Sequence, residues 1–176
     1  MKKLILIFIA IIFSIEVYAE SIKFMGQPLG CKYSIMKQHL LSKNFKFIKE
    51  AQPFIYEYKG IFGGDKVSVC VYTTPKSHLV STIAICYDDF YARKSDKYKT
   101  RILFEKKESL VNSFKKIYGP PIFDNKELTT WTFPDNRISI MYCDYHPEID
   151  SPIDLVIFYK DEKTLNLELQ EKESDY

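Results

Sequence analysis

The sequence predicts an α+β fold, a tandem repeat of a helix plus a three-stranded antiparallel sheet, with the helices packed on one sheet face. Three observations lead to this prediction: two helical segments, six short strand-like segments, and sequence matches between corresponding strands. We expect a signal peptide at residues 1–19, the first unit at 20–95, the second at 96–163 and an acidic tail at 164–176.

The first unit is predicted from residues 34–87. Ser34 to Ser42 carries apolar residues at helical spacing. Strand-like segments of aromatic or alternating content follow at 54–59, 66–72 and 79–87, and a Gly-rich turn at 60–65 separates the first two.

The second unit has the same predicted order. A longer helix is expected over residues 99–118, where apolar residues recur at seven-residue steps, and Gly119-Pro120-Pro121 ends it. Strands are expected at 128–133, 137–143 and 153–160. After these we expect a short helix or strand, and then disorder from about Gln170.

Corresponding strands also match in sequence, which favours duplication. The matched pairs are Lys66-Val67-Ser68-Val69 with Arg137-Ile138-Ser139-Ile140, Ala84-Ile85-Cys86-Tyr87 with Val156-Ile157-Phe158-Tyr159, and Tyr56-Glu57-Tyr58 with Trp131-Thr132-Phe133.

Alternation along the strands predicts which side chains face the helices. The inward set is Val67, Val69, Val71, Leu79, Ile83 and Ile85 in the first unit, and Ile138, Ile140, Tyr142, Leu155, Ile157 and Tyr159 in the second. The opposite face would then carry an apolar strip of Tyr72, Met141, Val156 and Phe158. We interpret this strip as a partner-binding site; the alternative is that an extra strand or the C-terminal tail packs over it.

Four cysteines follow residue 19: Cys31, Cys70, Cys86 and Cys143. Three pairings are open, and so is the question of whether they pair at all. A register with Val71 opposite Leu79 would put Cys70 and Cys86 roughly 20 Å apart along the strands, too far for a disulfide.

The first nineteen residues have the pattern of an export signal. Lys2 and Lys3 precede an apolar run from Leu4 to Ile15, and Val17-Tyr18-Ala19 offers small residues for cleavage before Glu20. An uncleaved membrane anchor is the alternative, but the run is shorter than the ~20 residues of a spanning helix. We therefore expect a periplasmic or secreted protein with no membrane span after cleavage.

Composition and motifs narrow the function classes. The 25 basic and 23 acidic residues nearly balance, which argues against nucleic acid as a partner. No cysteine or histidine spacing fits a metal site, and we expect no cofactor. The only local cluster with catalytic residue types is Cys143, Asp144 and His146, which gives the alternative of a small envelope hydrolase or thiol enzyme. The expectation is a binding module, not an enzyme, with an envelope or secreted protein as its partner.

Several short motifs carry a family resemblance. They are Phe24-Met25-Gly26-Gln27-Pro28-Leu29, Lys43-Asn44-Phe45, Lys59-Gly60, Tyr118-Gly119-Pro120-Pro121 and Trp131. The chain resembles uncharacterised exported proteins of Bacteroides-type Gram-negative bacteria, and its plan is similar to the beta-lactamase-inhibitor-protein fold. That resemblance implies a concave sheet with helices behind it and partner binding on the sheet, but it identifies no target.

Overall fold

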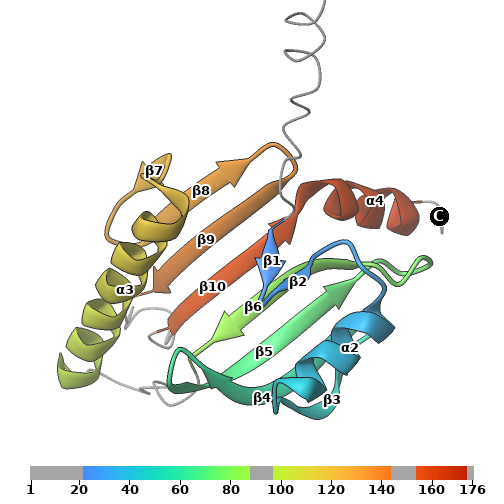
Figure 1. The fold of residues 1–176 in the computed structure, drawn as a ribbon, viewed down its shortest axis with the longest axis horizontal. Helices are drawn as coiled ribbons and strands as arrows, with labels where there is room; N and C mark the ends of the chain where they lie inside the picture. The colour runs from blue at the N-terminus through green and yellow to red at the C-terminus, as the bar shows by residue number, and fades with distance from the viewer. Residues whose placement is uncertain (1–21, 88–96, 144–153, 174–176) are drawn as a thin grey trace, which may run out of the picture.

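An eight-stranded antiparallel sheet forms the centre of the structure (Figure 1). The computed structural model describes residues 22–87, 97–143 and 154–173. In these residues, three helices and a two-stranded hairpin accompany the large sheet. Figure 1 shows α2, α3 and the hairpin β1–β2 in front of the sheet, so they share one of its faces.

The helices and strands have the following bounds. In chain order they are β1 (Lys23–Phe24), β2 (Gln27–Pro28), α2 (Tyr33–Ser42), β3 (Lys46–Gln52), β4 (Ile55–Phe62), β5 (Asp65–Thr73), β6 (Val80–Cys86), α3 (Lys97–Tyr118), β7 (Phe123–Asp124), β8 (Leu128–Phe133), β9 (Asn136–Cys143), β10 (Asp154–Asp161) and α4 (Glu162–Glu173).

The predicted tandem repeat of a helix plus a three-stranded sheet is wrong. The strand order is β3-β4-β5-β6-β10-β9-β8-β7, a single sheet in which β6 and β10 are neighbours. These two strands pair with Ile85 opposite Ile157, so neither is the edge of a smaller sheet. The backbone groups of β6 and β10 satisfy each other, which removes two costly open edges. The sequence pattern also missed β3 and β7, the strands at the two real edges.

The predicted division into faces is confirmed for the core. Every inward residue predicted in the strands is buried except Leu79, which is partly exposed. The register of the β5–β6 hairpin is different, because Val71 lies opposite Ile83 instead of Leu79. The loop contains Thr74, whose Oγ1 accepts the Leu79 N–H at 3.0 Å, and β6 therefore starts later than predicted. The shift is an even number of residues from Thr82 onward, so Ile83 and Ile85 keep their predicted face. An irregularity between Tyr72 and Thr73 places Val80 opposite Thr73, where the predicted parity no longer holds.

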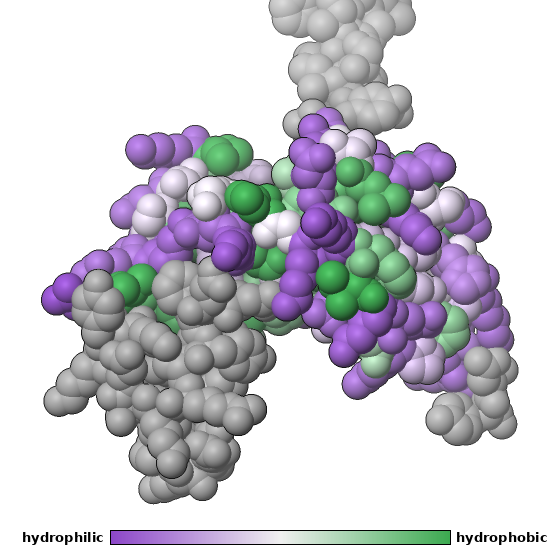
Figure 2. Space-filling view, turned by 90° about the horizontal axis from the view of Figure 1, so that it is seen from below, coloured by the Kyte–Doolittle hydropathy of each residue, from purple (hydrophilic) through white to green (hydrophobic). Residues whose placement is uncertain are grey.

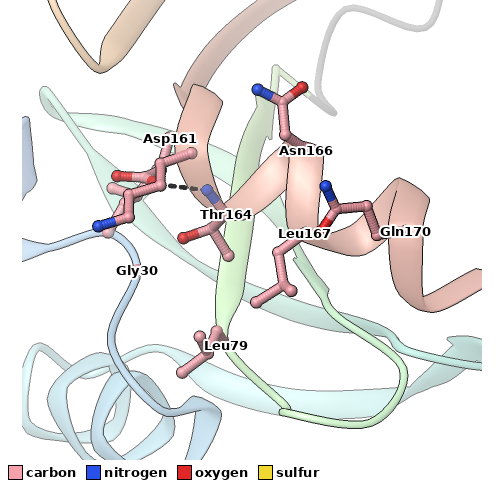
Figure 3. A pocket seen from close by; sticks show the side chains of 9 residues that line it. Gly30, Leu79, Asp161, Thr164, Asn166, Leu167 and Gln170 are labelled. Carbon is pink, nitrogen blue, oxygen red and sulfur yellow. Dashed lines mark hydrogen bonds between the residues drawn. The ribbon is translucent and has the colours of Figure 1, made fainter.

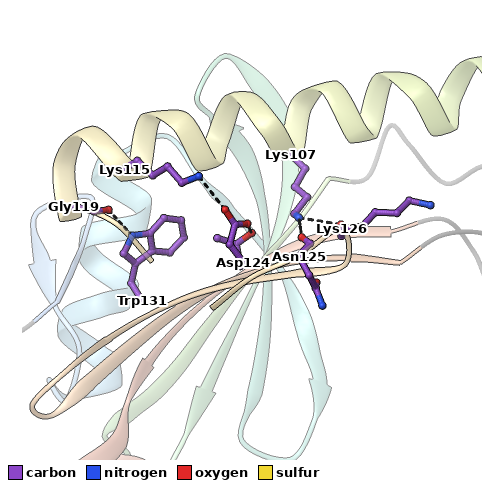
Figure 4. A network of polar contacts seen from close by, with 8 residues as sticks. Lys107, Lys115, Gly119, Asp124, Asn125, Lys126 and Trp131 are labelled. Carbon is purple, nitrogen blue, oxygen red and sulfur yellow. Dashed lines mark hydrogen bonds and ion pairs between the residues drawn. The ribbon is translucent and has the colours of Figure 1, made fainter. Parts of the chain in front are cut away.

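A polar network fastens α3 to the strands at one edge of the sheet (Figure 4). Lys107 is 1% exposed, and its Nζ donates to the carbonyl oxygens of Asn125 and Lys126 at 2.5 and 2.9 Å. At the end of the helix, Trp131 Nε1 donates to the carbonyl oxygen of Gly119 at 2.9 Å. Helix packing therefore depends on hydrogen bonds from the middle and from the C-terminal end of α3 as well as on its apolar side chains.

Carboxylates hold α4 against the loop before β6. Asp161 Oδ1 accepts the Thr164 N–H at 2.7 Å, which caps the start of the helix. Further along, Glu168 accepts a hydrogen bond from the Ser81 hydroxyl, and Glu171 accepts one from the Ser77 hydroxyl. The helix continues to Glu173, so the expectation of disorder from about Gln170 is wrong for these residues.

The edge strand β3 is irregular. Ile48 and Ala51 have no partner residue on β4, because the register shifts between Phe47 and Lys49 and again between Glu50 and Gln52. All seven residues of β3 are exposed. Each extra residue breaks the hydrogen-bond ladder locally and bends the strand.

Candidate functional site

The predicted apolar strip lies on the sheet face away from α2 and α3, which we call the far face. Val156 and Met141 are direct partners on β10 and β9, and Phe158 follows two residues after Val156. Tyr72 is on β5, opposite Thr82 of β6, which in turn lies opposite Lys160 of β10. The structure thus places all four predicted residues on the same face, with Tyr72 separated from the other three by β6.

Burial divides the four residues. Tyr72, Met141 and Phe158 are partly exposed, whereas Val156 is only 5% exposed. Ala84, which lies between Cys70 and Phe158 across the sheet, is 2% exposed. The apolar centre of the far face is therefore recessed, and Phe158, Met141 and Tyr72 offer its accessible contacts.

Two cysteines lie near Tyr72 on this face. Cys70 is opposite Ala84, two residues before Cys86 on β6, so the cysteines are diagonal neighbours and not roughly 20 Å apart as the predicted register required. Neither of these two cysteines forms a disulfide in the structure. Burial first, and then the nearby Cys70 and Cys86, raise the pKa of Tyr72, so this phenol stays protonated and can donate a hydrogen bond.

The far face also carries a group of basic side chains that the sequence analysis did not single out. Lys46 on β3 lies opposite Lys59 on β4, and Lys66 on β5 follows near the same end of the sheet. With Asn44 and Ile61, these lysines line a surface cavity of about 330 Å³. A sequence signal existed, because the lysines alternate with inward residues such as Tyr58 and Val67 along their strands.

A larger cavity lies on the opposite side of the sheet, beside α4 (Figure 3). Its volume is about 620 Å³, and its lining includes Gly30, Asp161, Thr164 and Leu167. Gly30 has φ +75°, and a Cβ at this position would lie 3.2 Å from Thr164 Oγ1. Asp161 is already used as the cap of α4, so this cavity is lined in part by groups that stabilise the fold.

The alternative catalytic cluster falls mostly outside the described residues. Cys143 is the last residue of β9, opposite Asp154 on β10, whereas Asp144 and His146 lie in the segment that the structure does not describe. Within the described ranges there is no group of three or more His, Cys, Asp or Glu residues that could hold a metal ion. The thiol-enzyme alternative therefore stays a prediction.

With this geometry in place, the chain was compared with known proteins. No family model matches it, and searches of the curated proteins and of the solved structures also found no match. The resemblance to exported Bacteroides-type proteins stays a prediction.

The predicted signal peptide, residues 1–19, lies outside the described part of the chain. Among the helices that the structure describes, none is both long enough and apolar enough to cross a membrane.

Proposed function

We propose that this chain is an exported, non-enzymatic binding module of the cell envelope that holds a protein partner on the far face of its sheet. The observation that carries the proposal is the accessible apolar group of Phe158, Met141 and Tyr72 on a face where Figure 1 labels no helix. The export part rests on the sequence of residues 1–19.

The far face has the composition of a protein interface. Its centre is apolar, and basic side chains such as Lys46, Lys49 and Lys66 lie to one side of it, on β3 and β5. Protein interfaces commonly combine an apolar core with a polar rim. Figure 2 shows the molecule from below, where most of the described surface is hydrophilic and apolar side chains gather in small groups.

The proposal predicts that charges in the apolar centre abolish partner binding. We would replace Met141 and Phe158 by Asp in the tagged mature chain and recover bound proteins from the envelope fraction of the source organism. A partner captured by the wild type should be lost, because each substitution removes apolar contact area and adds a carboxylate that must be desolvated in the interface.

Two further variants make this experiment decisive. Ile122→Asp adds a carboxylate at a side chain that is 70% exposed and lies outside the strands, and it should leave capture unchanged. Phe158→Ala removes contact area without adding a charge. It replaces the double variant in the experiment if thermal denaturation shows that the double variant is not folded. If the folded variant with Asp at positions 141 and 158 captures the partner as well as the wild type does, the far face is not the binding site.

A further inference from the structure

We infer that the protein partner on the far face is acidic, and that it inserts an apolar side chain flanked by carboxylates between the lysines of β3–β5 and the recessed centre. This inference rests on the proposed function and names the chemistry of its partner. It follows from the charge distribution on the sheet, from the shape of the apolar centre and from the position of the lysines.

The charge on the far face is strongly one-sided. Among strand residues with described side chains, the registers place six basic residues and one acidic residue, Glu57, on this face. The basic residues are Lys46, Lys49, Lys59, Lys66, Arg137 and Lys160. These strand residues therefore give the far face an excess of five positive charges (six minus one), although the whole chain has a formal net charge of only +2. A surface of one sign favours a partner of the opposite sign.

Part of this charge already has a partner within the chain. Lys49 Nζ lies 3.7 Å from Glu57 Oε2, and Arg137 Nε lies 3.0 Å from Glu162 Oε1. Lys46 lies opposite Lys59 on the adjacent strand, and Lys66 lies near the same corner of the sheet. Lys46 and Lys66 line the cavity of about 330 Å³ there, where the carboxylates of an acidic ligand would meet their ammonium groups.

The shape of the face favours a protein over a membrane or a nucleic acid. Insertion into lipid requires protruding apolar side chains, whereas Phe158, Met141 and Tyr72 are only partly exposed here and Ala84 and Val156 are buried. A phosphate backbone would pair with the lysines but would leave Phe158 and Met141 without apolar contacts. A protein segment that combines carboxylates with an apolar side chain satisfies both regions.

A peptide-binding experiment tests the inference on the full chain. The probe is a short fluorescein-labelled peptide with a central phenylalanine flanked by glutamates, and the matched peptide has lysines in place of the glutamates. Fluorescence anisotropy should show binding of the acidic peptide, weakening as salt is added, and much weaker binding of the basic one. The double variant K46E/K66E should bind the acidic peptide at least about tenfold more weakly, equivalent to ~1.4 kcal/mol.

The control double variant has the same charge change elsewhere. K116E/K163E reverses two exposed lysines on α3 and α4, away from the far face, and should keep the affinity of the wild type within about twofold. The test variant should fold, since Lys46 and Lys66 are both exposed and surface substitutions usually change stability little. Thermal denaturation checks both variants.

The outcomes separate this inference from the proposed function. The inference of an acidic partner would be overturned if the chain bound the two peptides equally. It would also be overturned if both double variants weakened binding of the acidic peptide by the same factor. The inference would also fail if the chain bound duplex DNA or phosphatidylserine vesicles more tightly than the peptide and K46E/K66E lost that binding. The ligand would then belong to another class. If an envelope partner depends on Phe158 and Met141 but not on Lys46 and Lys66, the binding module stands and its partner is not acidic.

Discussion

The ammonium group of Lys107 stabilises the position of α3 from inside the protein. Burial lowers the pKa of Lys107, although the nearby Asp124 and Glu108 oppose this effect. The two carbonyl oxygens that it binds belong to the loop between β7 and β8 (Figure 4). A buried cation is tolerated here because its ammonium group donates hydrogen bonds to two backbone carbonyl oxygens.

Replacing Lys107 by Met should therefore lower the free energy of unfolding by about 1–3 kcal/mol, because the aliphatic chain fills the same space but loses the hydrogen bonds to the Asn125 and Lys126 carbonyls. Urea denaturation measures the change. Lys116→Met, at an exposed position on the same helix, should change it by less than about 0.5 kcal/mol. Equal effects of the two substitutions would mean that the Lys107 hydrogen bonds do not stabilise the fold.

Gly60 illustrates a second constraint that only the structure reveals. The sequence analysis assigned it to a turn, but it lies within β4, opposite Val67. A Cβ at this position would lie 2.7 Å from both Cγ and Cε1 of Phe45, an overlap that the ring must move to relieve. The sequence showed a glycine but could not show that an aromatic ring from the end of α2 covers it.

Gly60→Ala should consequently destabilise the protein by roughly 1–3 kcal/mol, as overpacked cores do. Combining it with Phe45→Leu should recover part of the loss, because a smaller side chain leaves room for the new methyl group. Both quantities come from chemical denaturation of the two single variants and the double variant. Strict additivity of the two substitutions would contradict direct contact between these residues.

At the scale of elements, the docking of α4 depends on the charge of Glu171. Burial alone would raise the pKa of Glu171, but hydrogen bonds from the Ser77 hydroxyl and from the N–H groups of Lys76 and Ser77 outweigh it and lower this pKa. A lowered carboxylate pKa stabilises the fold above the ordinary value and loses that contribution as the pH falls through the folded-state value.

Thermal unfolding of the wild type should therefore show a decline in Tm as the pH is lowered below about 4.5, the ordinary range of a glutamate. Glu171→Gln should lower the Tm at neutral pH and should flatten this part of the pH profile. Glu173→Gln, an exposed glutamate at the end of the same helix, is the control and should retain the wild-type profile. A profile of Glu171→Gln that is parallel to the wild type would exclude Glu171 as the titrating group.

The accuracy of the sequence prediction also varied by element. The strand at 128–133 was predicted with its observed bounds, because alternation and a clear turn define it. The β3 strand was missed because its two extra residues disrupt the alternation on which the prediction depends. The predicted register of β5 with β6 was also wrong, because the sequence of a strand does not show how many loop residues precede its first paired residue.

At the scale of the whole molecule, pairing of β6 with β10 makes the sheet one unit, which local patterns could not predict. Alternation predicted on which sheet face each side chain lies, and so it assigned Tyr72, Met141 and Phe158 to the same face. It did not show that Val156 is buried, nor that lysines from three strands meet at one corner, because both depend on neighbours that are distant in sequence.

One sheet should unfold in one transition. Ile85→Ala, at a fully buried position on β6, should lower stability by about 2–5 kcal/mol. Trp131 lies on β8, at the other side of the sheet, and its fluorescence should shift to the same lower midpoint as the far-UV circular dichroism signal. If the Trp131 midpoint stayed at the wild-type value, the two halves would be separate folding units.

The irregular edge strand β3 has a consequence for solubility. A regular edge would offer its free N–H and C=O groups to the edge of a second molecule, and sheets could then join end to end into aggregates. The extra residues Ile48 and Ala51 distort this template, and Lys46 and Lys49 add repulsion between copies. At the other edge, β7 is only two residues long. Deleting Ile48 and Ala51 should therefore make a concentrated solution scatter light, because a straightened β3 would recruit further chains.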